Sequence, residues 1–360
     1  MKRITENNVP VPDADQPLTR QKIADLIDRI RKSADKLEAD QTSRGDLKIL
    51  SRTLRELRYA FKVFAPYRTR RKVTIFGSAR VTKDMPTYQQ AVELGEAMAR
   101  KDWLVVTGAA SGIMEAGHVG AGRDHAMGLN IMLPFEQVAN EVIRGDHKLV
   151  NMKYFFTRKL MFVKECDAVV CLPGGFGTLD EAMEVITLLQ TGKRELVPVV
   201  LLDEPGGTYW RDWHEFVQRH LLDGSMISPS DFSLYKLCDD VEDTVEELLS
   251  FYRVFHSMRY VKNHLVFRLQ DELPVSLLEA INVHFEDLLA GGEFLQRPAL
   301  PGESDEPQLA DLPRLVFHFN RRSLGRLRQL IDAVNRGSVP SEPITDEISN
   351  GRPQPGAKAE

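Results

Sequence analysis

Three glycine-bearing turns are the first places in this sequence where residue types and spacing could do chemistry. They span residues 76–80, 107–112 and 173–178, and each follows a short apolar run that is typical of a buried strand. Glycine lets the backbone approach a ligand closely, and the helix that follows each turn offers unpaired N–H groups and a partial positive charge. One such turn alone would indicate only a tight bend, but three on one sheet edge predict a site for an anionic ligand.

The residues expected to bind this ligand come from all three turns. They are Gly77, Ser78, Gly108, Gly112, Pro173, Gly174, Gly175, Gly177 and Thr178. No turn contains the GxxxxGK[ST] pattern of a Walker A loop, and the first turn lacks the GxGxxG pattern of dinucleotide sites. The pattern therefore favours a mononucleotide or a sugar phosphate.

Two glutamates lie close behind these turns. Thr178 and Glu181 fit a capping box, with Thr178 at the N-cap and Glu181 at N3, and Glu115 lies in a first helical turn where a carboxylate suits the helix dipole. A carboxylate beside a phosphate site would nevertheless repel the phosphate. Ribose hydroxyls and a developing oxocarbenium ion both favour negative charge. We therefore interpret Glu181 as a catalytic candidate and Glu115 as a candidate for binding ribose, with helix capping as the alternative for each.

Arg158 and Lys159 are the candidate cations. On a helix they are neighbours of several aromatic residues in the segments 154–156 and 161–163. Their side chains could simply extend past these rings to water. Alternatively, one of them points into the ligand cleft and pairs with an anion. The spacing leaves both interpretations open.

Alternating strands and helices must position these residues. The expected strands are 73–77, 104–108, 129–133, 168–172 and 197–203. The expected helices are 87–100, 112–127, 152–165, 178–191, 210–221 and 241–252. This alternation predicts an α/β fold with a doubly wound parallel sheet, whose strands all end at the same edge.

The flanking segments have different patterns. Residues 1–16 are polar and are expected to be disordered, and residues 17–70 have the periodicity of two amphipathic helices. Residues 71–254 are expected to form the nucleotide-binding domain. The pattern of residues 255–336 predicts a small α+β domain of βαβ type. Its expected strands are 260–269 and 315–320, and its expected helices are 276–289 and 324–334. The tail 337–360 is rich in Pro, Ser and Gly and is expected to be disordered.

Composition excludes several classes of function. The 360 residues carry a net charge of -5, which argues against nucleic acid as a partner, and no apolar run is long enough to span a membrane. The three cysteines form no CxxC pair and have no zinc spacing, so we expect buried free thiols and no metal site. Together these features predict a cytoplasmic protein.

The segment 173–181 resembles the PGGxGTxxE motif of the LOG family, the cytokinin-activating phosphoribohydrolases once mislabelled lysine decarboxylases. Met152 with Arg158 and Lys159 is similar to that family's Met-x-x-Arg-Lys helix, with a longer spacing, and the segment 112–116 resembles the GIMEA sequence of longer bacterial members. The resemblance covers roughly residues 70–250. The wider superfamily also contains molybdenum-cofactor carrier proteins, which are not hydrolases.

The resemblance implies a Rossmann-like fold, a homodimer or higher homo-oligomer, and hydrolysis of a nucleoside 5′-monophosphate to free base and ribose 5-phosphate. It implies that Arg158 and Glu181 are catalytic and that the glycines and threonine of 174–178 bind the phosphate, while Lys159 belongs to the same helix motif. This N-glycosyl hydrolase chemistry needs no cofactor. The alternative is a carrier or sensor that binds a nucleotide or cofactor and leaves it intact.

One departure from the family bears on that choice. The second turn of the family usually reads Gly-Gly-Gly, whereas this chain has Gly108-Ala109-Ala110. The added methyl groups are expected to narrow the approach of the backbone to the ligand, which would favour the carrier. Amino-acid decarboxylation is the weakest candidate, because no pair of residues marks a pyridoxal site.

Overall fold

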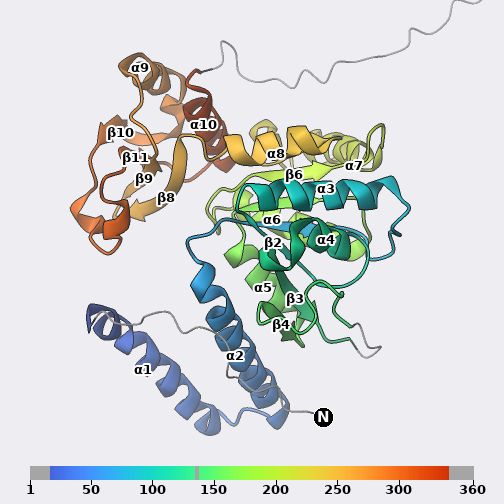
Figure 1. Ribbon diagram of the computed structural model, residues 1–360. Helices are drawn as coiled ribbons and strands as arrows, with labels where there is room; N and C mark the ends of the chain where they lie inside the picture. The colour runs from blue at the N-terminus through green and yellow to red at the C-terminus, as the bar shows by residue number, and fades with distance from the viewer. Residues whose placement is uncertain (1–16, 134–137, 340–360) are drawn as a thin grey trace, which may run out of the picture. The chain divides into compact units, whose positions relative to one another are not determined.

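The computed structural model describes residues 17–133 and 138–339, with side chains from residue 23 onward in the first helix (Figure 1). The expected disordered segment 1–16 and all but three residues of the tail 337–360 lie outside the described residues. The chain divides into two compact units, Met1–Leu249 and Ser250–Glu360. No helix in the described ranges combines the length and the hydropathy needed to cross a membrane.

The first unit is built on a seven-stranded sheet of order β4-β3-β2-β1-β5-β6-β7, in which every pairing is parallel. The strands are β1 (Lys72–Phe76), β2 (Leu104–Thr107), β3 (Ala126–Ile131), β4 (Leu149–Met152), β5 (Ala168–Cys171), β6 (Val199–Leu202) and β7 (Lys236–Cys238). Strands β1, β2, β3, β5 and β6 are buried along their whole length, as expected for parallel strands covered on both faces. The predicted doubly wound α/β fold is confirmed.

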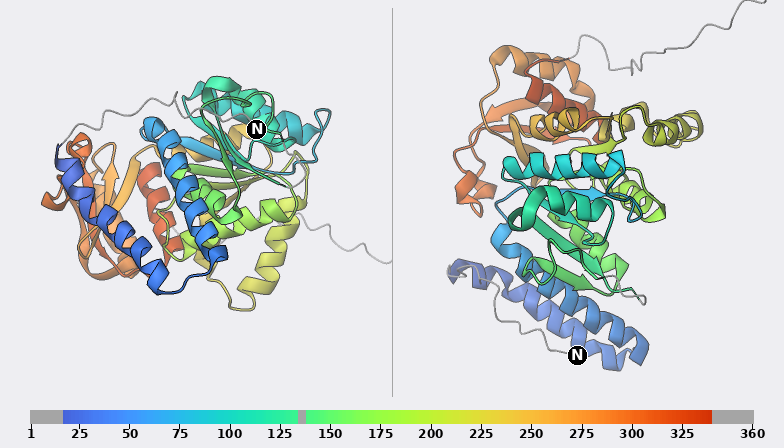
Figure 2. Two further views of the ribbon diagram at one scale, coloured as in Figure 1. Left: turned by 90° about the horizontal axis from the view of Figure 1, so that it is seen from below. Right: turned by 45° about the vertical axis from the view of Figure 1, so that its right-hand side comes forward.

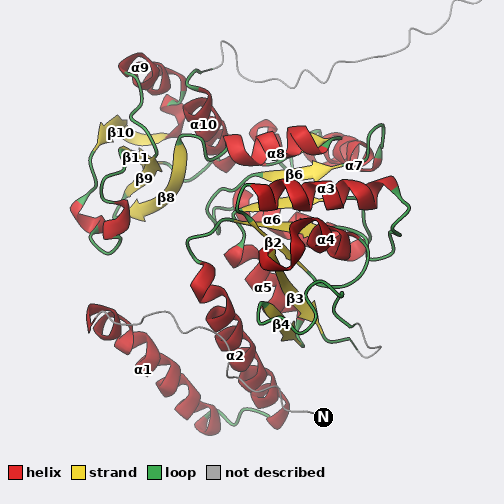
Figure 3. Ribbon diagram, in the orientation of Figure 1, coloured by secondary structure: helices red, strands yellow, loops and turns green. Residues whose placement is uncertain are grey.

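Helices cover both faces of this sheet (Figure 3). They are α3 (Pro86–Arg100), α4 (Ile113–His125), α5 (Phe155–Glu165), α6 (Phe176–Gln190), α7 (Tyr209–Phe216) and α8 (Val241–Ser250). Right-handed crossovers place α3 and α4 on one face, where they pack together, and α5 and α6 on the other. The sequence did not predict β4, because its residues were read as the approach and start of a helix from 152. It also missed β7, which has only three residues.

Two helices precede the sheet, α1 (Pro17–Ala39) and α2 (Arg44–Phe64). The chain reverses direction between them, and α1 projects away from the sheet (Figure 2). Helix α2 packs against α5 and β4, and it buries Glu56, Ala60, Val63 and Phe64. The amphipathic pattern predicted for 17–70 is explained in α2 by its inner face, which covers part of the first unit.

The second unit is a four-stranded antiparallel sheet of order β10-β11-β9-β8. Its elements are β8 (Phe255–Val261), β9 (His264–Leu269), α9 (Val275–His284), β10 (Leu289–Arg297), β11 (Arg314–Phe319) and α10 (Leu324–Arg336). The chain thus runs through two hairpin-plus-helix halves. The expected βαβ arrangement is wrong: the single strand expected at 260–269 bends into a hairpin at Lys262, where φ is 54°. The helix expected at 276–289 stops at His284, and β10 begins at Leu289.

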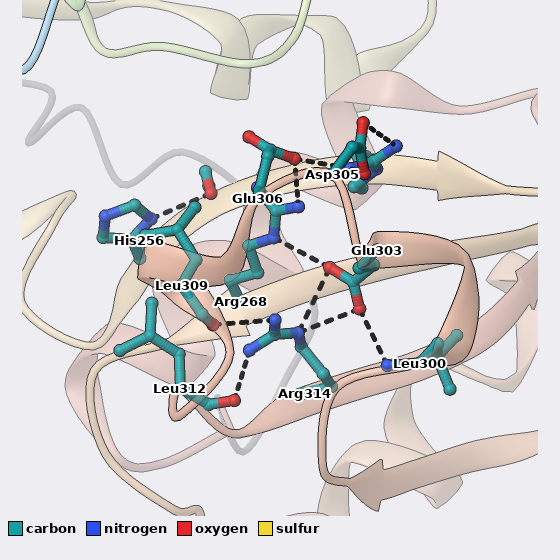
Figure 4. Close-up of polar contacts among 11 residues, drawn as sticks. His256, Arg268, Leu300, Glu303, Asp305, Glu306, Leu309, Leu312 and Arg314 are labelled. Atoms are coloured by element: carbon teal, nitrogen blue, oxygen red, sulfur yellow. Dashed lines mark hydrogen bonds and ion pairs between the residues drawn. The ribbon is translucent and has the colours of Figure 1, made fainter. Parts of the chain in front are cut away.

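The segment 298–313 is held to this sheet by buried ion pairs (Figure 4). Arg268 on β9 and Arg314 on β11 are register partners, and their side chains are 4% and 1% exposed. Both donate to the carboxylate of Glu303, at 2.9 Å from Arg268 Nε and 3.0 Å from Arg314 Nε. The backbone N–H of Leu300 donates to the same carboxylate. Glu303 therefore bridges two buried guanidinium groups, and Glu306 of the same segment is a second carboxylate partner of Arg268.

Candidate functional site

The strand order places a crevice between β1 and β5. From β1 the sheet grows through β2, β3 and β4 on one side and through β5, β6 and β7 on the other. Such a reversal leaves a crevice at the carboxyl ends of the strands, where open α/β sheets bind ligands. A cleft of about 790 Å³ lies there. Its lining residues are Phe76, Gly77, Ser78, Ala79, Arg80, Met114, Phe155, Arg158, the segment 174–181 and Tyr209.

The third turn forms one wall of the cleft. The N–H of Ser78 donates to Pro173 O at 3.1 Å, which joins the first and third turns, and the hydroxyl of Tyr209 donates to Gly174 O at 2.7 Å. A Cβ at Gly174 would lie 2.1 Å from Thr178 Oγ1, so packing requires glycine there. A Cβ at Gly175 or Gly177 would meet no protein atom within 4 Å, which leaves the space beside them open.

The helix behind this turn begins earlier than the sequence suggested. Helix α6 starts at Phe176 with Gly175 as its N-cap, so Thr178 lies inside the first turn. The expected capping box, with Thr178 at the N-cap and Glu181 at N3, is therefore wrong. Glycines 174 and 175 extend the turn and let the helix start closer to the strand. Glu181 lies beyond the first turn, which removes the structural explanation that competed with a chemical role.

Glu181 is a buried carboxylate at the wall of the cleft. Its residue is 6% exposed, and Lys159 Nζ lies 3.2 Å from its Oε2. Burial raises the pKa of Glu181 above its ordinary value, although the charges of Lys159 and Arg158 act in the opposite direction. A buried carboxylate interacts strongly and favourably with a positive charge that develops beside it.

Arg158 reaches the cleft from the second turn of α5. Its guanidinium lies over the rings of Phe155 and Phe162, at 5.8 and 5.2 Å from the ring centroids. Its Nε is buried and has no hydrogen-bond partner among the described residues. Burial lowers the pKa of Arg158, and the charge of Glu181 opposes this shift. Arg158 therefore brings a largely buried positive charge to the lining of the cleft.

Lys159 lies behind Glu181 and does not line the cleft. Its Nζ contacts three carboxylates of α6: Asp180 at 2.9 Å, Glu181 at 3.2 Å and Glu184 at 2.7 Å. Burial acts to lower the pKa of Lys159, but the hydrogen bond to Asp180 and the charges of Glu181 and Glu184 outweigh it and leave the pKa raised. The geometry thus ties Lys159 to the orientation of Glu181, whereas the sequence suggested contact with the substrate.

The second turn supports the cleft from the side of β2. A Cβ at Gly108 would lie 2.6 Å from Met114 Sδ and 3.2 Å from a terminal nitrogen of Arg158. Gly112 has a φ of 67°, and a Cβ there would lie 2.3 Å from Ser78 O. Gly112 therefore allows the first and second turns to pack closely, and Gly108 leaves room for the side chains of Met114 and Arg158. Neither glycine belongs to the cleft lining, although the sequence suggested that both bind the ligand.

The methyl groups of this turn do not narrow the cleft, contrary to expectation. Ala109 has a φ of 60° and is fully buried, and it packs in a core cluster with Ala126, Ala139 and Ile143. Ala110 is 4% exposed, and neither alanine lines the cleft. The sequence could not reveal this, because the direction of a methyl group depends on the local φ and on the neighbouring strand.

A buried histidine fixes the same turn. His118 donates from Nε2 to Met127 O at 2.9 Å, and its Nδ1 lies 3.2 Å from the amide nitrogen of Asn140. The N–H of Asn140 donates to Ala109 O at 2.8 Å, and that of Ala109 donates to Thr107 Oγ1 at 3.0 Å. Complete burial lowers the pKa of His118 to about 4, so the ring is neutral near pH 7. The second turn is therefore fixed at Ala109 by hydrogen bonds to both its carbonyl and its N–H.

The remaining predicted residues lie around the first turn. Ser78 lines the cleft, accepts from Arg80 N at its Oγ and accepts from Ile113 N at its carbonyl. A Cβ at Gly77 would lie 2.6 Å from Ile113. Glu115 forms an ion pair with Lys83 at 3.2 Å and does not line the cleft. Its proposed contact with ribose stays a prediction.

Several lining residues were not predicted to bind the ligand, among them Met114, Phe155 and Tyr209. Tyr209 lies far along the chain from the turn that it contacts, and no motif surrounds it. Phe155 was considered only as a neighbour of the two cations. No group of three or more potential metal-ligating side chains occurs within 17–133 and 138–339.

The sequence is similar to those of known proteins over the part of the chain that contains the cleft turn 173–178. The family model described as "Possible lysine decarboxylase" matches residues 106–248. A probable cytokinin riboside 5′-monophosphate phosphoribohydrolase of Oryza sativa subsp. japonica is 35% identical over 182 residues, which cover 49% of this chain and 77% of that protein. The chain belongs to the LOG family. A cytokinin riboside 5′-monophosphate phosphoribohydrolase of Arabidopsis thaliana is 31% identical over 185 residues and is covered to 81%.

The segment that matches the family model, residues 106–248, lies within the first unit. The matched segment contains Arg158, Glu181 and the turn 173–178, but neither the first turn nor the second unit. Among solved structures, the molybdenum cofactor binding protein from Rippkaea orientalis is 18% identical, with a TM-score of 0.36, and covers 50% of this chain and 96% of its own.

Proposed function

We propose that this LOG-family chain hydrolyses the N-glycosidic bond of a nucleoside 5′-monophosphate to free base and ribose 5-phosphate. The buried carboxylate of Glu181, in the same cleft as the guanidinium of Arg158 and the N-terminus of α6, is the observation that supports this proposal best. The carboxylate can stabilise a transition state with positive charge on the ribose, and the guanidinium and the helix N-terminus can both bind an anion such as the phosphate. The names of the plant relatives point to the same class of reaction.

The phosphate is proposed to bind at the turn 174–178. Helix α6 has 15 residues, and its N-terminal N–H groups and dipole favour an anion there. The open space beside Gly175 and Gly177 lets the phosphate approach the backbone. Binding energy at this end of the nucleotide then positions C1′ near Glu181 without taking part in bond cleavage.

In the proposed reaction the bond from C1′ to the base nitrogen breaks, and its electron pair leaves with the base, which takes up a proton. The oxygen of a water molecule forms the new bond to C1′. Glu181 stabilises the positive charge that develops on the ribose and accepts a proton from the water. Arg158 fits two roles, because it can pair with the phosphate or assist the departing base.

The experiment that tests this function is base release by the wild-type chain from a panel of nucleoside 5′-monophosphates, with the matching nucleosides as controls. We expect release of base and ribose 5-phosphate from at least one monophosphate, and far slower release from its nucleoside, because the phosphate anchors the substrate. Binding of a monophosphate without cleavage would instead support the carrier or sensor. One argument for the carrier was that the methyl groups of this turn narrow the approach to the ligand. The methyl group of Ala109 packs in the core, so this argument no longer holds for that residue.

We also propose that the chain forms a homo-oligomer through its N-terminal helices. Helix α1 exposes four apolar side chains at helical spacing, and an isolated helix of this kind is marginal in water. They are Ile23, Leu26, Ile27 and Ile30, which are 42–52% exposed. Sedimentation velocity should show a dimer or larger species that Leu26→Asp with Ile30→Asp dissociates, whereas Arg29→Ala leaves it intact. A wild-type monomer at micromolar concentration would contradict this assignment.

A further inference from the structure

The helix that carries Arg158 and Lys159 lacks a cap of its own. Its N-cap residue is Tyr154, whose side chain makes no capping hydrogen bond. Glu56 on α2 binds on both sides of this N-cap: the N–H of Lys153 donates to its Oε1 at 2.7 Å, and the hydroxyl of Thr157 donates to its Oε2 at 2.8 Å. The start of α5 is therefore anchored by a carboxylate from a helix about a hundred positions earlier in the chain.

The environment keeps this carboxylate charged. Glu56 is 5% exposed, and burial acts to raise its pKa. Hydrogen bonds from Arg52, Lys153 and Thr157 outweigh burial and leave the pKa below its ordinary value. Arg52 lies on the outer side, with its Nε 2.7 Å from Oε1. A negative charge at the N-terminus of α5 also interacts favourably with the helix dipole.

Thr157 immediately precedes the two cations of the site. Because successive residues of a helix move together, the bond between Glu56 and Thr157 restrains the turn from which Arg158 and Lys159 project. Lys159 in turn holds the carboxylate of Glu181 at 3.2 Å. A continuous chain of contacts thus runs from the N-terminal extension to the reactive carboxylate.

We propose that Glu56 is a positioning residue for the reaction, which holds the first turn of α5 so that Lys159 and Arg158 keep their places beside Glu181. The inference rests on the proposed function. It gives the N-terminal extension, which lies outside the matched family segment, a role in the chemistry. Supporting residues of this kind hold reacting groups within a fraction of an ångström of the productive geometry.

The variants Glu56→Gln and Glu56→Ala test this role. We expect Glu56→Ala to lower kcat by about 10- to 100-fold, because small displacements of reacting groups have effects of this size. KM should change less than kcat, since the N–H groups and the dipole that favour the phosphate belong to α6. The low-pH limb of the rate profile should also move to higher pH, because Glu181 loses part of the stabilising charge of Lys159. Glu56→Gln keeps one acceptor and should give a smaller shift in the same direction.

Arg52→Met is the matched control. It removes the outer partner of Glu56 but leaves both bonds to α5, so kcat and the pH profile should stay at their wild-type values. A role of Glu56 in stability alone would lower the midpoint of unfolding in Glu56→Ala and leave the pH limb in place. That result would overturn the proposal. If Glu56→Ala does not fold, Glu56→Gln and Thr157→Val provide the same comparison.

Hydrogen exchange of the amides of 153–158 separates this inference from the proposed function, because it needs no turnover. We expect faster exchange at the start of α5 in Glu56→Ala, and unchanged exchange in α6. If the wild type cleaves no monophosphate, the proposed function fails, and the chemical role of Glu56 fails with it. Faster exchange in Glu56→Ala would still establish that Glu56 anchors the start of α5. Unchanged exchange together with an unchanged pH limb would refute the anchor while the hydrolase stands.

Discussion

Glu181→Gln is expected to lower kcat for base release by about 100- to 10,000-fold, the range that a positioned acid–base group contributes. Glutamine has nearly the same shape, but it is neutral and cannot stabilise a cationic ribose or accept a proton from water. Nucleotide affinity should change little, because the phosphate contacts lie at the start of α6. Steady-state kinetics with the best monophosphate, together with equilibrium binding to the variant, measures both quantities.

The pH profile gives an independent view of the same carboxylate. Burial raises the pKa of Glu181, so the group becomes ionised only at a pH above the ordinary range of glutamate. Activity that needs the ionised form therefore rises with pH through this raised pKa and falls as pH drops below it. Glu181→Gln should lack this limb in whatever activity remains.

Glu184→Gln is the matched control for Glu181→Gln. Glu184 contacts the same Lys159 Nζ at 2.7 Å, but it does not line the cleft. Its substitution removes a charge from the same cluster and leaves the reactive carboxylate in place, so we expect only a small loss of kcat. Equal losses in the two variants would show that Glu181 acts through the charge of the cluster and not on the substrate.

Glu303→Ala is expected to destabilise the second unit by about 3–5 kcal/mol, the cost of breaking a buried ion pair by removing one partner. The substitution leaves Arg268 and Arg314 buried, with side chains 4% and 1% exposed, without their shared carboxylate. Burial acts to raise the pKa of Glu303, but bonds from Arg314, Leu300 and Arg268 leave it lowered. The stabilisation is therefore present above the ordinary glutamate pKa and is lost as pH falls through the lowered value.

Exchange of the amides in β9 and β11 of the full chain, with chemical denaturation, measures this loss. The control is Asp305→Asn, since Asp305 pairs with Arg259 at 3.0 Å but its side chain is 47% exposed, and exposed pairs contribute about 1 kcal/mol or less. Similar losses in the two variants would mean that Glu303 is not the main link between the segment 298–313 and the sheet.

The sequence predicted the parts of the site that depend on local pattern. Apolar runs followed by glycine turns indicated the parallel strands, and right-handed connections placed the turns on one edge. The sequence could not supply the order of the strands, on which the crevice between β1 and β5 depends. Nor could it place the start of α6. Thr178 and Glu181 had the pattern of a capping box, but the N-cap of the helix is Gly175.

Contacts between distant segments were beyond sequence reasoning for a different reason. The bond between Glu56 and the start of α5 and the bond from Tyr209 to Gly174 join residues that no periodicity relates. In the second unit, the hairpin at Lys262 lies inside an apolar pattern that a single long strand would also satisfy. Asn263 in this turn is a typical turn residue, but Lys262, which takes the positive φ, is not.

The short edges of the main sheet have a consequence for self-association. Edge strands with unpaired N–H and C=O groups are templates for aggregation. Here the edges are β4 and β7, with only four and three residues, and α2 packs beside β4. Little free backbone is left for another chain to extend the sheet. The main sheet is therefore protected against edge-to-edge growth into a fibre by the shortness of its outer strands.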